Sequence, residues 1–237
     1  MAHARRWVRA LLPMRCLLCG DAADDANLCN GCRGDLPRNE PACVRCALPL
    51  PDAREEQCGA CLRRSPPWDR ARAALRYAFP VDVLVTRLKF RGQLAAAPAL
   101  AGIMADRAPL LDPVRDLLIP VPLHWRRKCM RGYNQAEQLA RHLGRRTGIP
   151  VRAGWLARRR RTRAQSVLAA AQRRRNVRGA FSWRGPPSRD FGAILVDDVM
   201  TTGATLAECA RLARRAGAGR VELWVAARAL PEGKHGA

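Results

Sequence analysis

Residues 194–206 read Ile-Leu-Val-Asp-Asp-Val-Met-Thr-Thr-Gly-Ala-Thr-Leu. The apolar run at the start has the length of a strand and ends in two adjacent acids, Asp197 and Asp198. A turn rich in hydroxyl groups follows, and residues 206–216 have the composition of a helix that Gly217 ends. The stretch therefore predicts a strand, an acidic edge, a phosphate-binding turn and a helix, in that order.

The turn has the chemistry that a phosphate group requires. Backbone N–H groups in the first turn of a helix have no partner within the helix, and the positive end of the helix dipole lies behind them. Glycine lets the backbone approach a ligand closely, and threonine hydroxyls add donors. The predicted phosphate ligands are Thr201, Thr202, Gly203, Ala204 and Thr205.

The two acids precede this turn at the carboxyl end of a strand, which is where open α/β sheets bind their ligands. Carboxylates at that edge suit ribose hydroxyls or a hydrated Mg²⁺ ion. A sugar phosphate would satisfy both the acids and the turn. The alternative is an ordinary buried strand followed by a capped helix, which leaves the two neighbouring acids unexplained.

Positive charge is concentrated in the second half of the chain. The formal net charge is +23, and residues 138–189 contain fifteen arginines but no Asp or Glu. Residues 1–67 contain ten basic and eight acidic side chains. This concentration favours a polyanionic partner, either nucleic acid or a substrate with a pyrophosphate group. The alternative is a general preference for arginine in residue usage.

Eight of the ten cysteines form four Cys-x-x-Cys pairs: Cys16/Cys19, Cys29/Cys32, Cys43/Cys46 and Cys58/Cys61. We expect no secretory signal, so the pattern favours zinc over disulfides. Two such pairs complete a tetrahedral Cys₄ site, and eight thiolates predict two structural zinc ions. We favour sequential pairing, with the first four cysteines in one site, over an interleaved arrangement. A redox role for one pair is the rival hypothesis.

A proline-rich joint at residues 64–67 divides the chain into a double zinc-ribbon module, residues 1–67, and a second domain, residues 68–237. In the second domain we expect strands at residues 73–79 and 117–121, and helices at residues 80–90 and 94–108, the latter broken near Pro98. Alternating strands and helices predict an α/β fold with a parallel sheet flanked by helices.

The chain shows no apolar run of the ~20 residues that a bilayer span needs, so we expect no transmembrane segment and a cytoplasmic location. A basic peripheral contact of residues 5–15 with the inner face of the membrane is an alternative.

Two further stretches are rich in cations. Residues 119–136 contain the segments PVPLH and RGYNQA, and the loop between a predicted strand and a helix capped by Asn134 suits a polyphosphate. Residues 162–177 have arginines at both ends and small residues between them, which is typical of a mobile loop or a helical hairpin. The alternative for this second stretch is a solvated basic face of a helix.

Residues 193–205 resemble the phosphoribosyl pyrophosphate signature of type I phosphoribosyltransferases. In combination, PVPLH, RGYNQA, the pattern TxxQxxL with RxxNV, and DDVMTTGAT resemble the competence protein F (ComF) family in order and spacing. The likeness extends over residues 16–228. Members of that family join a double zinc ribbon to a type I phosphoribosyltransferase domain similar to that of amidophosphoribosyltransferases.

The resemblance implies displacement of pyrophosphate from C1 of the ribose through a transition state like an oxocarbenium ion. It implies that Asp197 and Asp198 hold the ribose hydroxyls, that residues 201–205 hold the 5-phosphate, and that Mg²⁺ bridges ribose and pyrophosphate. Residues 162–177 would close as a lid against water. The leaving pyrophosphate is assigned to three cations: Arg126, Lys128 and Arg131.

Three functions are therefore expected to compete. The first is a phosphoribosyl pyrophosphate-binding protein of DNA uptake whose zinc module and arginine-rich surface, including residues 158–161, hold single-stranded DNA. DNA-uptake helicase or channel proteins are its expected partners. The second is an active phosphoribosyltransferase, a pentosyltransferase, on an unknown acceptor. The third is a sensor of phosphoribosyl pyrophosphate without turnover. We expect His124 to be structural or to contact phosphate, and Cys129 and Cys209 to be incidental.

Overall fold

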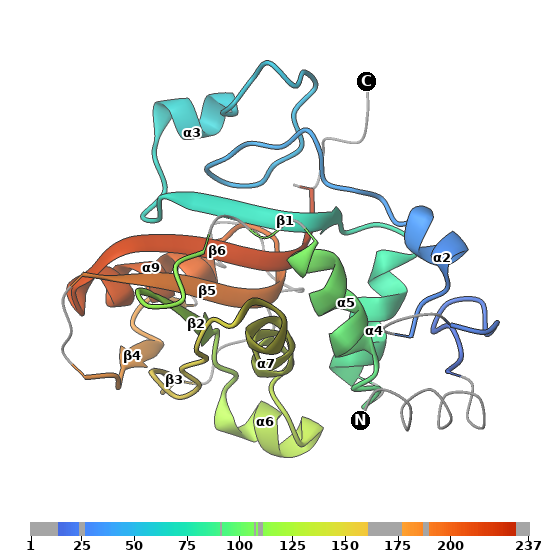
Figure 1. Cartoon of the computed structure of the whole chain (residues 1–237). Coiled ribbons are helices and arrows are strands. Elements are labelled where there is room, and N and C mark those ends of the chain that lie inside the picture. Colours follow the sequence, from blue (N-terminus) through green and yellow to red (C-terminus); the bar gives the residue numbers. More distant parts are fainter. Residues whose placement is uncertain are drawn as a thin grey trace.

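The centre of the protein is a four-stranded sheet in which every neighbouring pair of strands is parallel. The computed structural model describes residues 14–23, 27–90, 92–106, 108, 111–160, 177–186 and 190–230. The strand order is β1-β6-β5-β2 (Figure 1). The bounds are β1 Arg70–Arg76, β2 Asp116–Pro120, β5 Phe191–Met200 and β6 Ala218–Arg228.

Strand β5 is an inner strand that is buried on both faces, which explains the unbroken apolar run in its sequence. Its side chains alternate between two cores. Ile194 and Val196 belong to one core with Trp224 of β6, whereas Ala193 and Leu195 belong to the other. The register places Ile194 beside Leu118 of β2.

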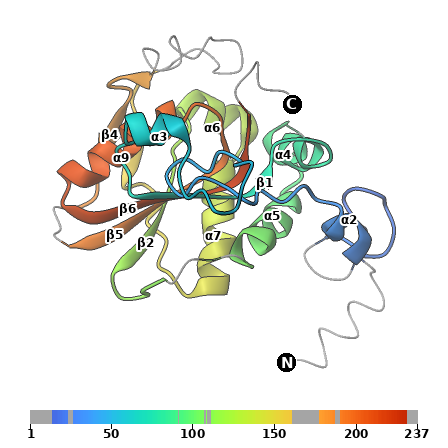
Figure 2. The ribbon, with the colours of Figure 1, turned by 90° about the horizontal axis from the view of Figure 1, so that it is seen from above.

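Helices cover both faces of the sheet (Figures 1 and 2). One face packs against α4 (Val81–Phe90), α5 (Ala96–Ala105) and α7 (Gln135–Thr147). The other face packs against α9 (Ala204–Arg215) and the antiparallel pair β3 (Leu156–Arg158) and β4 (Phe181–Trp183). A short helix, α6 (Trp125–Arg131), follows β2. The predicted parallel sheet flanked by helices is confirmed.

Two expectations about local structure need correction. Helix α5 is not broken at Pro98, because this proline is the third residue of the helix, where a backbone N–H has no partner to lose. The first strand covers residues 70–76 rather than 73–79, because its pairing with β6 begins at Arg70, opposite Glu222, and ends at Arg76, opposite Arg228. By contrast, Asn134 caps α7 as expected, since its side chain accepts a hydrogen bond from Ala136 N at 3.2 Å.

The N-terminal module has two clusters of four cysteines, and the pairing is sequential. The clusters are Cys16, Cys19, Cys29, Cys32 and Cys43, Cys46, Cys58, Cys61, with the sulfur atoms of each within 4.8 Å of one another. Zinc–sulfur bonds of about 2.3 Å in a tetrahedron put sulfurs about 3.8 Å apart, and Sγ of Cys46 and Cys58 are 3.6 Å apart. Four thiolates at this spacing are the ligand set of a tetrahedral zinc site, so both clusters fit structural zinc.

Backbone donors surround the sulfurs, as expected for thiolate ligands. Burial raises the pKa of the Cys16 thiol, but hydrogen bonds from backbone N–H groups outweigh it and hold the pKa at about 6. Cys29 and Cys58 are the N-caps of the two short helices of the module, α2 (Asn30–Gly34) and α3 (Gly59–Arg63).

The module covers the outer edge of β1. Ala71 N donates to Val44 O at 2.9 Å, and Arg76 N donates to Pro37 O at 2.9 Å. An edge strand with free N–H and C=O groups is a template for pairing with other chains. The N-terminal module therefore closes this edge. The predicted boundary between domains at residues 67 and 68 stays a prediction, because the two parts share contacts along β1.

Within the described part of the chain, every helix is too short or too polar to cross a bilayer.

We expect two zinc ions per purified chain, and one ion after either Cys16→Ser or Cys58→Ser, because each substitution removes one of four ligands from a different site. Elemental analysis by mass spectrometry measures the stoichiometry. The control is Cys129→Ser, an exposed cysteine outside both clusters, which should keep two ions. A zinc-free protein with cysteines joined in disulfides would contradict the assignment.

Candidate functional site

In the turn between β5 and α9, the backbone at Gly203 lies too close to neighbouring side chains for any residue but glycine. Gly203 has φ 72°, a conformation that L side chains rarely adopt. A Cβ atom at this position would lie 2.9 Å from Met200 Cε and 3.0 Å from Trp68 Cη2. Glycine is therefore required both by the backbone angle and by the surrounding side chains.

The threonines before Gly203 form the opening of helix α9. Thr202 Oγ1 accepts a hydrogen bond from Ala204 N at 3.4 Å, and Ala207 N donates to Gly203 O at 2.8 Å as the helix begins. The first turn of this twelve-residue helix thus directs N–H groups and hydroxyls out of the carboxyl end of the sheet. The structure places Thr201, Thr202, Gly203, Ala204 and Thr205 in one turn, as the sequence predicts.

The acid pair lies just before this turn, near the carboxyl end of β5. Asp197 Oδ1 accepts a hydrogen bond from Asp198 N at 2.9 Å, and Asp198 Oδ1 accepts one from Val199 N at 2.7 Å. Asp198 is 3% exposed, whereas Asp197 is partly buried. Each carboxylate therefore has one oxygen engaged by the local backbone and a second oxygen that faces other groups.

The second oxygen of Asp198 faces Lys89 of α4. Lys89 Nζ lies 3.2 Å from Asp198 Oδ2, so the two form an ion pair. Apart from this ion pair, Oδ2 accepts no hydrogen bond from the part of the chain that the structure describes. A buried carboxylate oxygen without a donor is costly unless a ligand or water supplies one. A ribose hydroxyl has the donor that this oxygen lacks.

Asp197 is the group whose ionisation the site changes most. Burial raises its pKa to about 8, and the negative charge of Asp198 adds to this rise, while the Asp198 N–H and Lys89 oppose it. The pKa of Asp197 is thus raised chiefly by burial and further by the neighbouring negative charge. A cation or a cationic transition state next to Asp197 would favour its ionised form.

Arg158 of β3 completes the surroundings of Asp197. Its guanidinium stacks on the Phe181 ring at 5.2 Å and is partly buried. Burial lowers its pKa, and Arg127 adds to this effect, whereas Cys209 and Asp197 oppose it electrostatically. The run at residues 158–161, predicted as a DNA contact, therefore contains one arginine that is partly buried beside Phe181, and the DNA contact stays a prediction. Arg159 and Arg160 are exposed, and Arg161 lies outside the described residues.

The three cations assigned to pyrophosphate lie on helix α6, where the sequence analysis expected a loop. His124 is the N-cap of this helix, with Nδ1 accepting from Arg126 N at 3.3 Å, which is a structural contact, and a phosphate contact stays a prediction. Lys128 Nζ is 3.7 Å from Glu137 Oε2. The Arg126 guanidinium lies 5.2 Å from the Trp125 ring. Both cations contact groups in or next to their own helix.

Arg131 lies closer to the residues around the acid pair. Its guanidinium lies 4.8 Å from the ring of Phe90, the residue that follows Lys89, and it donates to Gln135 Oε1 at 3.2 Å. Tyr133 OH donates to Leu88 O on the same helix α4. The RGYN segment is thereby fastened to the end of α4 that provides Lys89.

The predicted lid at residues 162–177 lies outside the described residues apart from Val177, which is buried in the core. Of the two cysteines without a partner motif, Cys129 is exposed and Cys209 is buried within α9. Among the described residues, neither cysteine belongs to a cluster of side chains that could bind a metal.

Sequence reasoning missed Lys89 and Arg158 as members of the site. Lys89 lies in an amphipathic helix more than one hundred residues before Asp198, and nothing in its local sequence distinguishes it from a solvated lysine. Arg158 stands in a row of arginines that looks uniform, and only the pairing of β3 with β4 separates it from its neighbours.

Known proteins resemble this chain in both parts. The family model of the double zinc ribbon domain matches residues 7–62. The DNA utilization protein YhgH of Salmonella typhi is 35% identical over 226 residues, covering 92% of this chain and 99% of that protein. Competence protein F of Haemophilus influenzae is 34% identical over 226 residues, covering 91% and 97%.

Among solved structures, the glutamine phosphoribosylpyrophosphate amidotransferase from B. subtilis matches 54% of this chain and 25% of its own, with 21% identity and a TM-score of 0.38. The two curated relatives match this chain over nearly their whole length. The chain therefore belongs to the competence protein F family.

Proposed function

We propose that this protein binds phosphoribosyl pyrophosphate together with Mg²⁺ at the carboxyl end of β5, and that it acts in the uptake or use of DNA. The observation that supports the proposal most is the turn at Gly203, which opens a helix directly after two acidic residues. The relatives named competence protein F and DNA utilization protein support the cellular role.

The site divides the ligand between its residues by charge and by geometry. The N–H groups and hydroxyls of residues 201–205 receive the 5-phosphate. The carboxylates of Asp197 and Asp198 receive the ribose hydroxyls, and Asp198 Oδ2 is the oxygen that a hydroxyl would satisfy. The pyrophosphate then extends toward the cations of α6, among which Arg131 is held next to α4.

Mg²⁺ fits this site as a partner of the ligand rather than as a resident metal. Asp197 and Asp198 provide the oxygen atoms that Mg²⁺ prefers, and Mg²⁺ commonly binds through one or two carboxylates plus substrate phosphates. The ion would neutralise the pyrophosphate. The chain's own contribution is to orient the ribose between the acids and the turn, and to supply positive charge at the pyrophosphate through Arg131.

We expect Asp197→Asn and Asp198→Asn to weaken the binding of phosphoribosyl pyrophosphate with Mg²⁺ by roughly one to two orders of magnitude each, because a hydrogen bond to a charged group contributes about 1.5 to 3 kcal/mol. Asp198→Asn should also lower the melting temperature, since Lys89 loses its counter-charge. Isothermal titration calorimetry and thermal unfolding measure the two effects.

The matched control for these variants is Asp35→Asn, an exposed aspartate of the N-terminal module. Unchanged affinity in the doubly substituted protein would show that the carboxylates do not hold the ribose. Release of pyrophosphate in the presence of an acceptor would establish an active transferase, whereas binding without release would favour the sensor.

Proton uptake provides a second test of Asp197. Its pKa in the folded protein is about 8, above the ordinary value of 3.8, so the folded state favours the protonated carboxyl. Stability without ligand should therefore fall as the pH rises from 6 to 8, while ligand affinity rises by up to about tenfold per pH unit. Asp197→Asn should remove the carboxyl's share of both trends.

The measurement is thermal unfolding and calorimetric titration at several pH values between 6 and 9, in which the difference between the parent and Asp197→Asn is followed. The 5-phosphate titrates in both proteins, so its contribution cancels in the difference. A difference that does not change with pH would mean that Asp197 is ionised throughout.

Single-stranded DNA is a second ligand, and the exposed face of α6 supports it. Trp125 is 60% exposed and Met130 is 87% exposed, on a helix of seven residues that also contains Arg126, Arg127 and Lys128. An exposed aromatic ring among cations is the combination that non-specific single-strand binders use, because bases stack on the ring while cations track the phosphates.

We expect Trp125→Ala to weaken binding of an oligothymidylate by about 1 to 3 kcal/mol, while Trp125→Phe retains most of the affinity. Replacing Lys128 with alanine should reduce the slope of log affinity against log salt, because one fewer counterion is released. Fluorescence anisotropy over a salt series measures both. Val114→Ala, which truncates another exposed apolar residue, is the control. Equal effects of Trp125→Ala and Val114→Ala would exclude the stacking role.

A further inference from the structure

Arg228, at the end of β6, lies between the second cysteine cluster and the phosphate turn. It is 6% exposed. Its Nε donates to Cys46 O at 3.0 Å, and its Nη1 donates to Met200 O at 3.0 Å and to Thr201 O at 2.6 Å. A third carbonyl, that of Ala229, accepts from the same Nη1. One guanidinium thus joins the backbone of a zinc-binding turn to the two residues that begin the phosphate turn.

The electrostatic setting of Arg228 points to the same cluster. A guanidinium keeps its charge, and a buried charge is costly unless an opposite charge or several hydrogen bonds compensate it. Arg228 is buried next to the second cluster, where the carbonyl of Cys46 accepts a hydrogen bond from its Nε. Zinc with four thiolates would carry a net charge of about −2. This negative charge would compensate the buried positive charge of Arg228.

A second contact runs from the same cluster to the other side of the turn. The Trp68 indole N–H donates to Arg45 O, in the turn between Cys43 and Cys46. Its ring lies under Gly203, 3.0 Å from the place where a Cβ atom would be. Ala47, Trp68, Met200 and Ala204 are all buried in one core. The first cluster, by contrast, packs against α4 and α5 through the other core.

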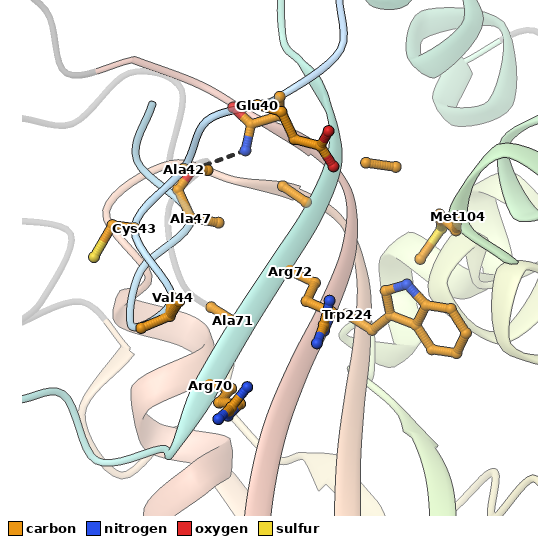
Figure 3. A pocket seen from close by; sticks show the side chains of 13 residues that line it. Glu40, Ala42, Cys43, Val44, Ala47, Arg70, Ala71, Arg72, Met104 and Trp224 are labelled. Carbon is orange, nitrogen blue, oxygen red and sulfur yellow. Dashed lines mark hydrogen bonds between the residues drawn. The ribbon is translucent and has the colours of Figure 1, made fainter. Parts of the chain in front are cut away.

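The rest of the interface between the second cluster and the sheet is partly hollow. A cavity of about 150 Å³ lies between the module and β1, with Cys43, Val44 and Ala47 on one side (Figure 3). Packing of Ala47 in the shared core and the hydrogen bond from Ala71 N to Val44 O hold the cluster against the sheet beside this cavity. Arg228 and Trp68 are direct links between the cluster and the turn.

We propose that the second zinc site is a positioning element of the phosphate turn, which acts through Arg228 and Trp68, and that the first zinc site has no such role. Cys43 and Cys46 would hold zinc together with Cys58 and Cys61, and their turn, once closed in this way, would fix the carbonyl groups of Arg45 and Cys46. The two carbonyls hold Trp68 and Arg228, which then hold Gly203, Met200 and Thr201. The inference rests on the proposed function for the identity of the ligand. The link between the second cluster and the turn does not depend on that ligand, because Arg228 and Trp68 make it within the chain.

The experiment compares Cys58→Ser with Cys29→Ser in the full chain. The two cysteines are matched, because each caps a five-residue helix and each belongs to a different cluster. Hydrogen–deuterium exchange of residues 200–206 should be at least tenfold faster in Cys58→Ser than in the parent, and unchanged in Cys29→Ser. Affinity for phosphoribosyl pyrophosphate with Mg²⁺, by calorimetry, should fall at least tenfold in Cys58→Ser alone.

Arg228→Lys is the second variant. Lysine keeps the positive charge, but a single ammonium group cannot donate to Cys46 O and Thr201 O in the way that the planar guanidinium does. The variant should retain two zinc ions by elemental analysis and still show the faster exchange. Exchange that is unchanged in Cys58→Ser, or faster to the same extent in Cys29→Ser, would overturn the linkage. If the parent binds no phosphoribosyl compound, the proposed function fails, and the exchange comparison alone decides the linkage.

Discussion

The burial of β5 constrains where the ligand can bind. The strand is hydrogen-bonded to β2 on one edge and to β6 on the other, and cores cover both of its faces. Polar side chains cannot be placed along such a strand without a large desolvation cost. Only its carboxyl end is open, and both acids and the turn at Gly203 are located there. The buried sheet therefore leaves the acid pair and the turn at Gly203 as the polar groups of β5 that a ligand can reach.

Much of this arrangement could be predicted from local sequence, because each signal needs only neighbouring residues. The apolar run before Asp197 indicated a strand, Gly203 indicated a special backbone angle, and the Cys-x-x-Cys spacing indicated zinc. The groups that were missed act over long distances in the chain. Lys89 reaches Asp198 only because α4 packs on one face of the sheet, and Arg228 reaches Cys46 across 182 positions. Periodicity and spacing contain no information on such pairs.

For Pro98 and Arg158, the position of the residue within its helix or strand decides its environment, and local sequence does not fix that position. Pro98 was expected to break a helix, but tolerance of proline depends on the position within the helix, and a shift of a few residues in the boundary reverses the outcome. Arg158 was grouped with its three neighbours in one run, but it is partly buried on the ring of Phe181, whereas Arg159 and Arg160 are exposed. The strongly basic composition therefore contains cations of two kinds: solvated ones, and a few that contact carboxylates, aromatic rings or backbone carbonyls inside the fold.

The position of β1 has a consequence for synthesis of the chain. It is the first strand of the sheet to leave the ribosome, yet its inner neighbour is β6, the last element of the sheet. At about 5 to 20 residues per second, the inner edge of β1 waits at least several seconds for its partner. The cysteine clusters precede β1, and their segment pairs with its outer edge. Early capture of zinc would thus shield half of an unpaired strand from aggregation while the remaining 150 or so residues are made.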